Sequence, residues 1–243
     1  MTLQVVAVFF VATLVRSALG FGEALIAVPL LAFVIPIDVA APVAVLVSIT
    51  VALVVVAQDW RQIHRQSAVR LVVATIGGIP FGLLLLTRVP APMVKSLLAV
   101  LVAGFSIWSL ASRRPRHLTD DRAAWLFGIG AGVLGGAYGM NGPPLVVYGS
   151  LRGWSPGQFR ATLQGYFLPA SLMGMAGYWA AGLWTSRVNR YYLDSLPAIL
   201  LAILLGHLIH RRLDARRFQS VVHVSLIMIG AVLFLQALGV LPG

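Results

Sequence analysis

Two charged residues, Arg16 and Glu23, lie deep inside the first long apolar stretch of this 243-residue chain. A charge near the middle of a membrane-spanning segment costs at least about 2.5–3.5 kcal/mol, so such residues usually serve a function or pair with each other. In a functional interpretation, Arg16 complements a bound anion and Glu23 gates the site or carries a proton. In a structural interpretation, the two side chains form a mutual pair that locks the local turn.

The stretch that holds these charges is broken between them by Gly20-Phe21-Gly22, and the fifth stretch is broken by a glycine-rich run at 135–144. A helix that restarts after such a break has N–H groups without intrahelical partners and the positive end of its dipole. Glycine also lets the backbone approach a bound group closely. Two such helix starts that face each other would bind a small anion. Close helix packing can explain one break alone, but two breaks at matching positions favour a binding site.

Polar side chains near the breaks complete the predicted site. Tyr138 and Asn141 supply donors at the second break, and the amide of Gln164 cannot be fully satisfied by its own helix. The hydroxyls of Ser48 and Thr50, in contrast, are expected to bond back to carbonyls of their own helix. No catalytic residue, metal ligand or cofactor is predicted. The predicted substrate-binding residues are Arg16, Gly20, Phe21, Gly22, Glu23, Tyr138, Gly139, Met140, Asn141, Gly142 and Gln164.

The composition indicates a membrane protein. Hydrophobic residues make up 59% of the chain and charged residues 10%, whereas soluble domains carry about 25% charged residues. Apolar stretches of the length needed to cross a bilayer must be helical, because helices satisfy their own backbone groups in lipid. The absence of cysteine excludes disulfides and thiolate chemistry. The eight stretches lie at about 3–35, 38–57, 66–87, 92–111, 123–151, 156–183, 191–210 and 217–241.

The order of features predicts an internal repeat. The longest polar connection, at 112–122, is rich in arginine and separates 1–111 from 123–243. Each half opens with a glycine-broken stretch, and the third stretch of each half contains a glycine, Gly82 or Gly206, with an arginine six residues later. We therefore predict two transmembrane repeats joined by a cytoplasmic linker.

The distribution of positive charge predicts how the chain crosses the membrane. If all eight stretches cross fully, nine Lys or Arg residues lie on one side and eight on the other. If the first and fifth stretches are re-entrant hairpins, the numbers become 13 and 4, which fits the excess of positive charge on cytoplasmic loops. Each half is then one hairpin plus three transmembrane helices, so the second half is inverted and both termini lie outside. The 13 are Arg61, Arg65, Arg70, Arg113, Arg114, Arg116, Arg122, Arg152, Arg160, Arg211, Arg212, Arg216 and Arg217, and the four are Arg88, Lys95, Arg187 and Arg190.

This arrangement resembles the sulfite exporter TauE/SafE family, also called the TSUP family. The resemblance rests on Gly20-Phe21-Gly22 with Pro29 after it, on the arginine-rich middle loop, and on Gly135-Gly136 to Pro143-Pro144, and it spans nearly the whole chain. It implies a multi-pass protein of the cytoplasmic membrane that exports sulfite or small organosulfonates such as sulfoacetate. The implied partners are a small anion and membrane lipid, not nucleic acid.

Two other functions compete with anion transport. The same hairpins could present carbonyl oxygens to a cation or a neutral solute, although the single deep carboxylate and the net charge of +11 argue against a cation. An intramembrane enzyme would need a nucleophile or a metal motif such as H-E-x-x-H, and the sequence has none. Import rather than export and coupling to a proton both remain open.

Overall fold

The structure is a computed structural model, and it describes residues 2–111, 118, 120–210 and four isolated C-terminal positions (227, 231, 234 and 235). Apart from those four positions, the predicted eighth stretch at 217–241 lies outside the described residues, as does most of the linker. The described part is helical, as the composition predicted. Its helices are α1 (Thr2–Leu19), α2 (Glu23–Leu31), α3 (Ile37–Asp59), the 3-10 turn η1 (Trp60–Gln62), α4 (Arg65–Arg88), α5 (Ala91–Ala111), α6 (Ala123–Tyr138), α7 (Gly142–Leu151), α8 (Pro156–Ala180) and α9 (Ser186–His210).

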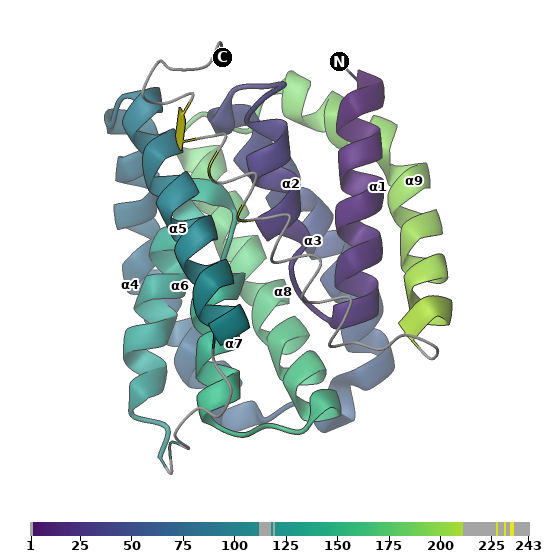
Figure 1. The fold of residues 1–243 in the computed structure, drawn as a ribbon, viewed down its shortest axis with the longest axis vertical. Helices are drawn as coiled ribbons and strands as arrows, with labels where there is room; N and C mark the ends of the chain where they lie inside the picture. Colours follow the sequence, from purple (N-terminus) through teal and green to yellow (C-terminus); the bar gives the residue numbers. More distant parts are fainter. Residues whose placement is uncertain are drawn as a thin grey trace.

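The helices form an upright bundle with two distinct ends (Figure 1). At one end, the start of α4 meets the segment before α6, where the hydroxyl of Ser67 donates to a carboxylate oxygen of Asp121 at 2.8 Å. At the other end, residues 32–38 lie together with the α4–α5 and α8–α9 connections, and Thr2 lies beside the start of α9. We call the first the arginine-rich end, because it carries Arg61, Arg65, Arg70, Arg122, Arg152 and Arg160, and the second the N-terminal end.

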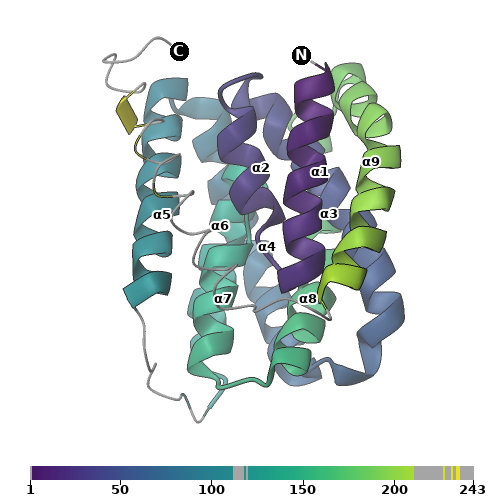
Figure 2. The ribbon, with the colours of Figure 1, turned by 45° about the vertical axis from the view of Figure 1, so that its right-hand side comes forward.

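Both broken stretches fold as helical hairpins. α1 starts at the N-terminal end and α2 returns to it (Figures 1 and 2). α6 starts at the arginine-rich end and α7 returns to it, where the N–H of Leu118 donates to the carbonyl of Leu151 at 2.7 Å. Each tip turns through glycines with positive φ, namely Gly20 and Gly22 in the first hairpin and Gly139 in the second, a conformation that only glycine adopts without strain. The two hairpins therefore open to opposite ends, with their tips inside the bundle.

Glycines also bring two pairs of helices into close contact, and the two pairs match. A Cβ on Gly82 of α4 would lie 2.1 Å from the carbonyl oxygen of Val133 and 2.8 Å from Cα of Gly136, both on α6. A Cβ on Gly206 of α9 would lie within 3.0 Å of atoms in 14–17 of α1. The contacted residues 14 and 17 lie six and three positions before Gly20, and the contacted residues 133 and 136 lie six and three positions before Gly139. The halves therefore use corresponding positions for corresponding contacts.

The outer surface of the bundle is apolar. Large side chains such as Leu126, Trp179, Phe81 and Leu204 are between 65% and 74% exposed. Among the residues that the structure describes, three helical segments, Ile37–Ala57, Arg65–Arg88 and Ser186–Gly206, are long and apolar enough to cross a membrane, and shorter apolar helices accompany them. Such a surface is unfavourable in water but matches lipid tails, as expected of a membrane protein.

Asp121 fixes the base of the second hairpin. Its carboxylate is 5% exposed and accepts hydrogen bonds from the hydroxyls of Tyr148 at 2.6 Å and Ser67 at 2.8 Å, with Nε of Arg152 3.3 Å away. Burial acts to raise the pKa of Asp121, but these hydrogen bonds and the charge of Arg152 outweigh it, so its pKa lies below the ordinary value. The ionised carboxylate thus joins the segment before α6 to α4 and α7.

We predict that Gly78→Ala destabilises the protein and that Gly77→Ala does not. A Cβ on Gly78 would lie 2.2 Å from the carbonyl oxygen of Ile129 and 2.9 Å from Cα of Gly132, whereas Gly77 has no such neighbour within 4 Å. Overpacking of this kind costs about 1–3 kcal/mol, while alanine at an open helical position adds helix propensity. Thermal unfolding of the two purified variants in detergent measures the difference. Equal midpoints would contradict the close α4–α6 contact.

We also predict that Asp121→Asn lowers stability at pH 7 by about 1–3 kcal/mol, because the buried donors lose a charged acceptor. Since the pKa of Asp121 is depressed on folding, its stabilisation is present above the unfolded value of about 3.9 and is lost as the pH falls through the lower folded value. The gap between the melting midpoints of wild type and variant should therefore narrow below about pH 4. Asp120→Asn, which removes an exposed carboxylate, serves as the control, and an equally large effect there would contradict the role of Asp121.

A polar cavity between two broken helices

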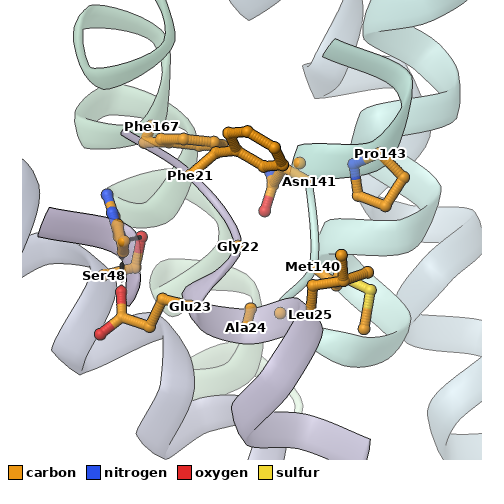
Figure 3. Close-up of a pocket in the computed structure, with 13 residues that line it drawn as sticks. Phe21, Gly22, Glu23, Ala24, Leu25, Ser48, Met140, Asn141, Pro143 and Phe167 are labelled. Atoms are coloured by element: carbon orange, nitrogen blue, oxygen red, sulfur yellow. Dashed lines mark hydrogen bonds and ion pairs between the residues drawn. The ribbon is translucent and has the colours of Figure 1, made fainter. Parts of the chain in front are cut away.

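The start of α2 and the start of α7 line one cavity in the interior of the bundle. Figure 3 shows Glu23 and Ser48 on one side of it and Met140, Asn141 and Pro143 on the other. The cavity is about 20 Å³, which is room for about one water molecule, so the structure shows the site closed. The residues that line it are Arg16, Phe21, Gly22, Glu23, Ala24, Leu25, Ser48, Gly139, Met140, Asn141, Gly142, Pro143 and Phe167.

Arg16 is the centre of a buried network. It is 3% exposed and forms a salt bridge with Glu23, which is 2% exposed. Its guanidinium also donates to Oγ of Ser48 at 3.0 Å and to Oε1 of Gln164 at 2.7 Å, and it lies 4.9 Å from the ring centroid of Phe167, a cation–π arrangement. The mutual pair of the structural interpretation is therefore formed, and both of its members also line the cavity.

The first tip places a helix start beside Arg16 at the cavity. Glu23 is the first residue of α2, so the N–H groups of residues 23–25 have no acceptor within the helix. The first backbone bond of the new helix runs from the N–H of Ile26 to the carbonyl of Gly22 at 3.1 Å. The second oxygen of Glu23 accepts from the hydroxyl of Thr13 at 2.8 Å. The dipole of α2 and the guanidinium of Arg16 thus act on the same small volume.

The start of α7 offers fewer hydrogen-bond donors than we expected when we predicted two helix starts that both bind the anion. α6 ends with the N–H of Gly139 bonded to the carbonyl of Gly135 at 2.9 Å, and α7 begins at Gly142. The next two residues, Pro143 and Pro144, have no N–H. The second helix start therefore offers the N–H of Gly142 and the side-chain amide of Asn141, whose Nδ2 also donates to the hydroxyl of Tyr166 at 3.4 Å, rather than a full set of backbone donors. The prolines were visible in the sequence and indicated this asymmetry.

Eight of the eleven predicted residues line the cavity, and Gly20, Tyr138 and Gln164 do not. The hydroxyl of Tyr138 donates to the carbonyl of Val94 at 3.0 Å, away from the cavity. Gln164 is 1% exposed, and both ends of its amide are used within the protein. Lining residues that were not predicted are Ala24, Leu25, Ser48, Pro143 and Phe167.

The expectation for Ser48 was wrong. Its hydroxyl accepts from the guanidinium of Arg16 and from the hydroxyl of Ser171 at 3.1 Å, because a charged donor within reach binds more strongly than a helix carbonyl. Thr50, two residues later on the same helix, does bond back to the carbonyl of Leu46 at 3.2 Å, as predicted. The residues around Ser48 could not predict its contact with Arg16, because Arg16 is 32 residues away in sequence.

The arrangement suits ligand binding. The cavity combines one guanidinium, one carboxylate, one hydroxyl and one carboxamide with apolar walls. Within the ranges that the structure describes, no three His, Cys, Asp or Glu side chains gather into a group that could hold a metal ion. A guanidinium next to a helix start is a receptor for a small oxyanion.

Comparison with known proteins identifies the family. The model of the family described as "Sulfite exporter TauE/SafE" matches residues 5–233. The chain belongs to the TauE/SafE family. Neither a curated protein nor a solved structure matches it. The TauE/SafE family consists of membrane transporters of sulfur anions such as sulfite, not of enzymes, and the match confirms the resemblance inferred from the glycine breaks.

In this TauE/SafE protein, Gln164 connects the second half of the chain to the first tip. Its Oε1 accepts from Arg16 at 2.7 Å, and its Nε2 donates to the carbonyl of Gly20 at 2.7 Å. One side chain of α8 therefore fixes both the guanidinium and the backbone turn before α2. Gln164 positions the site and does not line the cavity.

We predict that Gln164→Leu destabilises this TauE/SafE protein, since the change leaves a buried donor of Arg16 and the carbonyl of Gly20 without partners. Each unsatisfied group costs about 1–3 kcal/mol. Gln158→Leu, the same substitution on the same helix outside the network, is the matched control. Tryptophan fluorescence during thermal unfolding in detergent reports both variants, and equal midpoints would show that Gln164 does not hold the tip.

Proposed function

We propose that the protein is a secondary transporter that exports sulfite, or a small organosulfonate such as sulfoacetate, across the cytoplasmic membrane. The observation that carries the proposal is the single cavity shared by both broken helices, with the buried guanidinium of Arg16 in its wall. The family supplies the substrate class, a sulfur anion, and the cavity supplies a place for it.

The chemistry of the tip matches an oxyanion. Sulfite and sulfonate oxygens accept hydrogen bonds, and the N–H groups at the start of α2, together with Arg16, donate them. In a site closed to water these interactions are stronger than at a surface. A cation would face the guanidinium and the positive end of α2, and the one carboxylate in the wall, that of Glu23, is already paired with Arg16, so the geometry disfavours the cation alternative. Because the closed cavity holds about one water molecule, the two tips must move apart to admit the anion.

We place the arginine-rich end at the cytoplasm. The described residues at that end include Arg61, Arg65 and Arg152, whereas Arg88 and Arg187 lie toward the N-terminal end, and positive residues are retained on the cytoplasmic side. With this orientation the first hairpin enters and leaves from outside and the second from the cytoplasm, as re-entrant hairpins. The remaining arginines of the prediction, Arg113, Arg114, Arg116, Arg211, Arg212, Arg216 and Arg217, lie outside the described residues.

We further propose that the halves 1–111 and 123–243 are inverted repeats. A Cβ on Gly20 would lie 3.1 Å from Cγ of Arg160, and a Cβ on Gly139 would lie 2.8 Å from the carbonyl oxygen of Ala41. Arg160 and Ala41 are each the fifth residue of their helix, α8 and α3. Each tip therefore rests on the equivalent place of the other half. Rocking of one half against the other would expose the cavity to each side in turn.

We predict that vesicles containing the purified protein take up radiolabelled sulfite or sulfoacetate and that Arg16→Ala reduces the initial rate by about 10- to 100-fold. That range corresponds to losing a charge-assisted hydrogen bond of about 1.5–3 kcal/mol. Arg190→Ala removes an exposed arginine and should leave the rate close to that of wild type. Arg16→Lys keeps the charge but lacks the planar fork of donors that reaches separate partners, so we expect an intermediate rate.

Two outcomes would contradict the proposed function. Vesicles that take up neither anion faster than protein-free vesicles would exclude transport of this substrate class. Undiminished uptake by correctly folded Arg16→Ala, judged by size-exclusion chromatography, would remove Arg16 from the site.

A further inference from the structure

The carboxylate of Glu23 is paired with the guanidinium of Arg16, which an incoming anion needs as its own partner. Glu23 lines the cavity and forms a salt bridge with Arg16, and the two side chains are 2% and 3% exposed. The charges of the closed pair sum to zero. If a singly charged anion enters beside an ionised Glu23, two negative charges share one buried cation, which is unfavourable in a site removed from water.

The network is built so that Arg16 can lose Glu23 and stay in place. Ser48 and Gln164 hold the guanidinium by hydrogen bonds at 3.0 Å and 2.7 Å, and the ring of Phe167 lies against it. Within the described part of the chain, Nε of Arg16 has no hydrogen-bond partner, so the guanidinium keeps a donor for a further acceptor.

The surroundings of Glu23 also accept its neutral form. The hydroxyl of Thr13, which donates to the carboxylate at 2.8 Å, can rotate and accept a hydrogen bond from a protonated carboxyl. The ionised carboxylate of Glu23 repels a second anion, and protonation removes this repulsion. The charge that would balance a bound anion is therefore a proton on Glu23.

On the basis of the proposed function, we propose that Glu23 is a proton-binding site and that a proton on Glu23 and a singly charged anion at Arg16 cross the membrane together. The carboxylate takes a proton from water on the side where the anion enters, forming a carboxyl O–H, and returns it to water on the side where the anion leaves. No bond of the anion is made or broken. The loaded site then has the same net charge as the closed one, so transport of the anion is electroneutral and does not draw on the membrane potential. Export then depends on an outward gradient of the anion that exceeds any opposing proton gradient.

Few polar or charged side chains face Glu23 from the helices packed around it. α1 contributes Arg16 and Thr13, and α3 contributes Ser48. α8 contributes Gln164 and also Arg160, whose Cβ and Cγ lie against Gly20. The first six residues of α7 include no titratable side chain. The side chains of Lys95 on α5 and His207 on α9, two helices next to the first hairpin, lie outside the described residues.

The test measures radiolabelled sulfite uptake into vesicles with either a pH gradient or a membrane potential imposed. In wild type we expect an alkaline interior at zero potential to drive accumulation by up to about tenfold per pH unit, since one proton moves with each anion. A potential without a pH gradient should have little effect. In Glu23→Gln, whatever flux remains should respond to the potential, and its response to the pH gradient should be smaller than that of wild type. Asp194→Asn, which changes a carboxylate outside the cavity, is the matched control and should behave as wild type.

The comparison separates Glu23 from the acid–base chemistry of sulfite itself, because a given pH gradient changes the protonation of sulfite in the same way for wild type and variant. A response of Glu23→Gln to the pH gradient equal to that of wild type would overturn the proposal. So would wild-type uptake that follows the potential and not the pH gradient, a result that needs no variant. Absence of any wild-type uptake would instead overturn the proposed function on which the inference rests.

Discussion

The constraint on which the structure depends is the cost of keeping the Arg16 guanidinium away from water. A buried charge is tolerated only when it is paired and hydrogen-bonded, and Arg16 obtains its partners from three other helices: Glu23 from α2, Ser48 from α3 and Gln164 from α8. These helices come from both halves of the chain. The same network that satisfies one cation therefore fixes the first tip against the opposite half and places positive charge at the cavity.

Glycine makes this arrangement possible at two levels. Gly20, Gly22 and Gly139 turn the chain with positive φ inside the bundle, where another residue would be strained. Gly82 and Gly206 let α4 approach α6 and let α9 approach α1 at corresponding positions. These contacts hold the first helix of each hairpin, α1 or α6, in place. The tip of each hairpin therefore stays at the cavity. A transporter built in this way can separate the tips without unfolding either hairpin.

The sequence predicted the helices and both breaks, because composition and glycine position act locally. It also predicted most of the cavity wall, since the residues at a helix break lie at the tip wherever the hairpin packs. It did not predict that Ser48 and Phe167 line the cavity or that Gln164 serves Arg16, because these contacts join distant parts of the chain. The weaker donor set of the second tip could have been predicted from Pro143 and Pro144. The re-entrant topology and the inverted repeat remain predictions.

We propose that the anion binds between the two tips, next to Arg16. Selenite has the shape and charge of sulfite and carries an atom that scatters X-rays anomalously, so a crystal of the protein soaked in selenite locates the anion directly. We expect an anomalous peak between the first turn of α2 and Asn141, within hydrogen-bonding distance of Arg16. A peak elsewhere, for instance among the arginines around Asp121, with none between the tips, would contradict it.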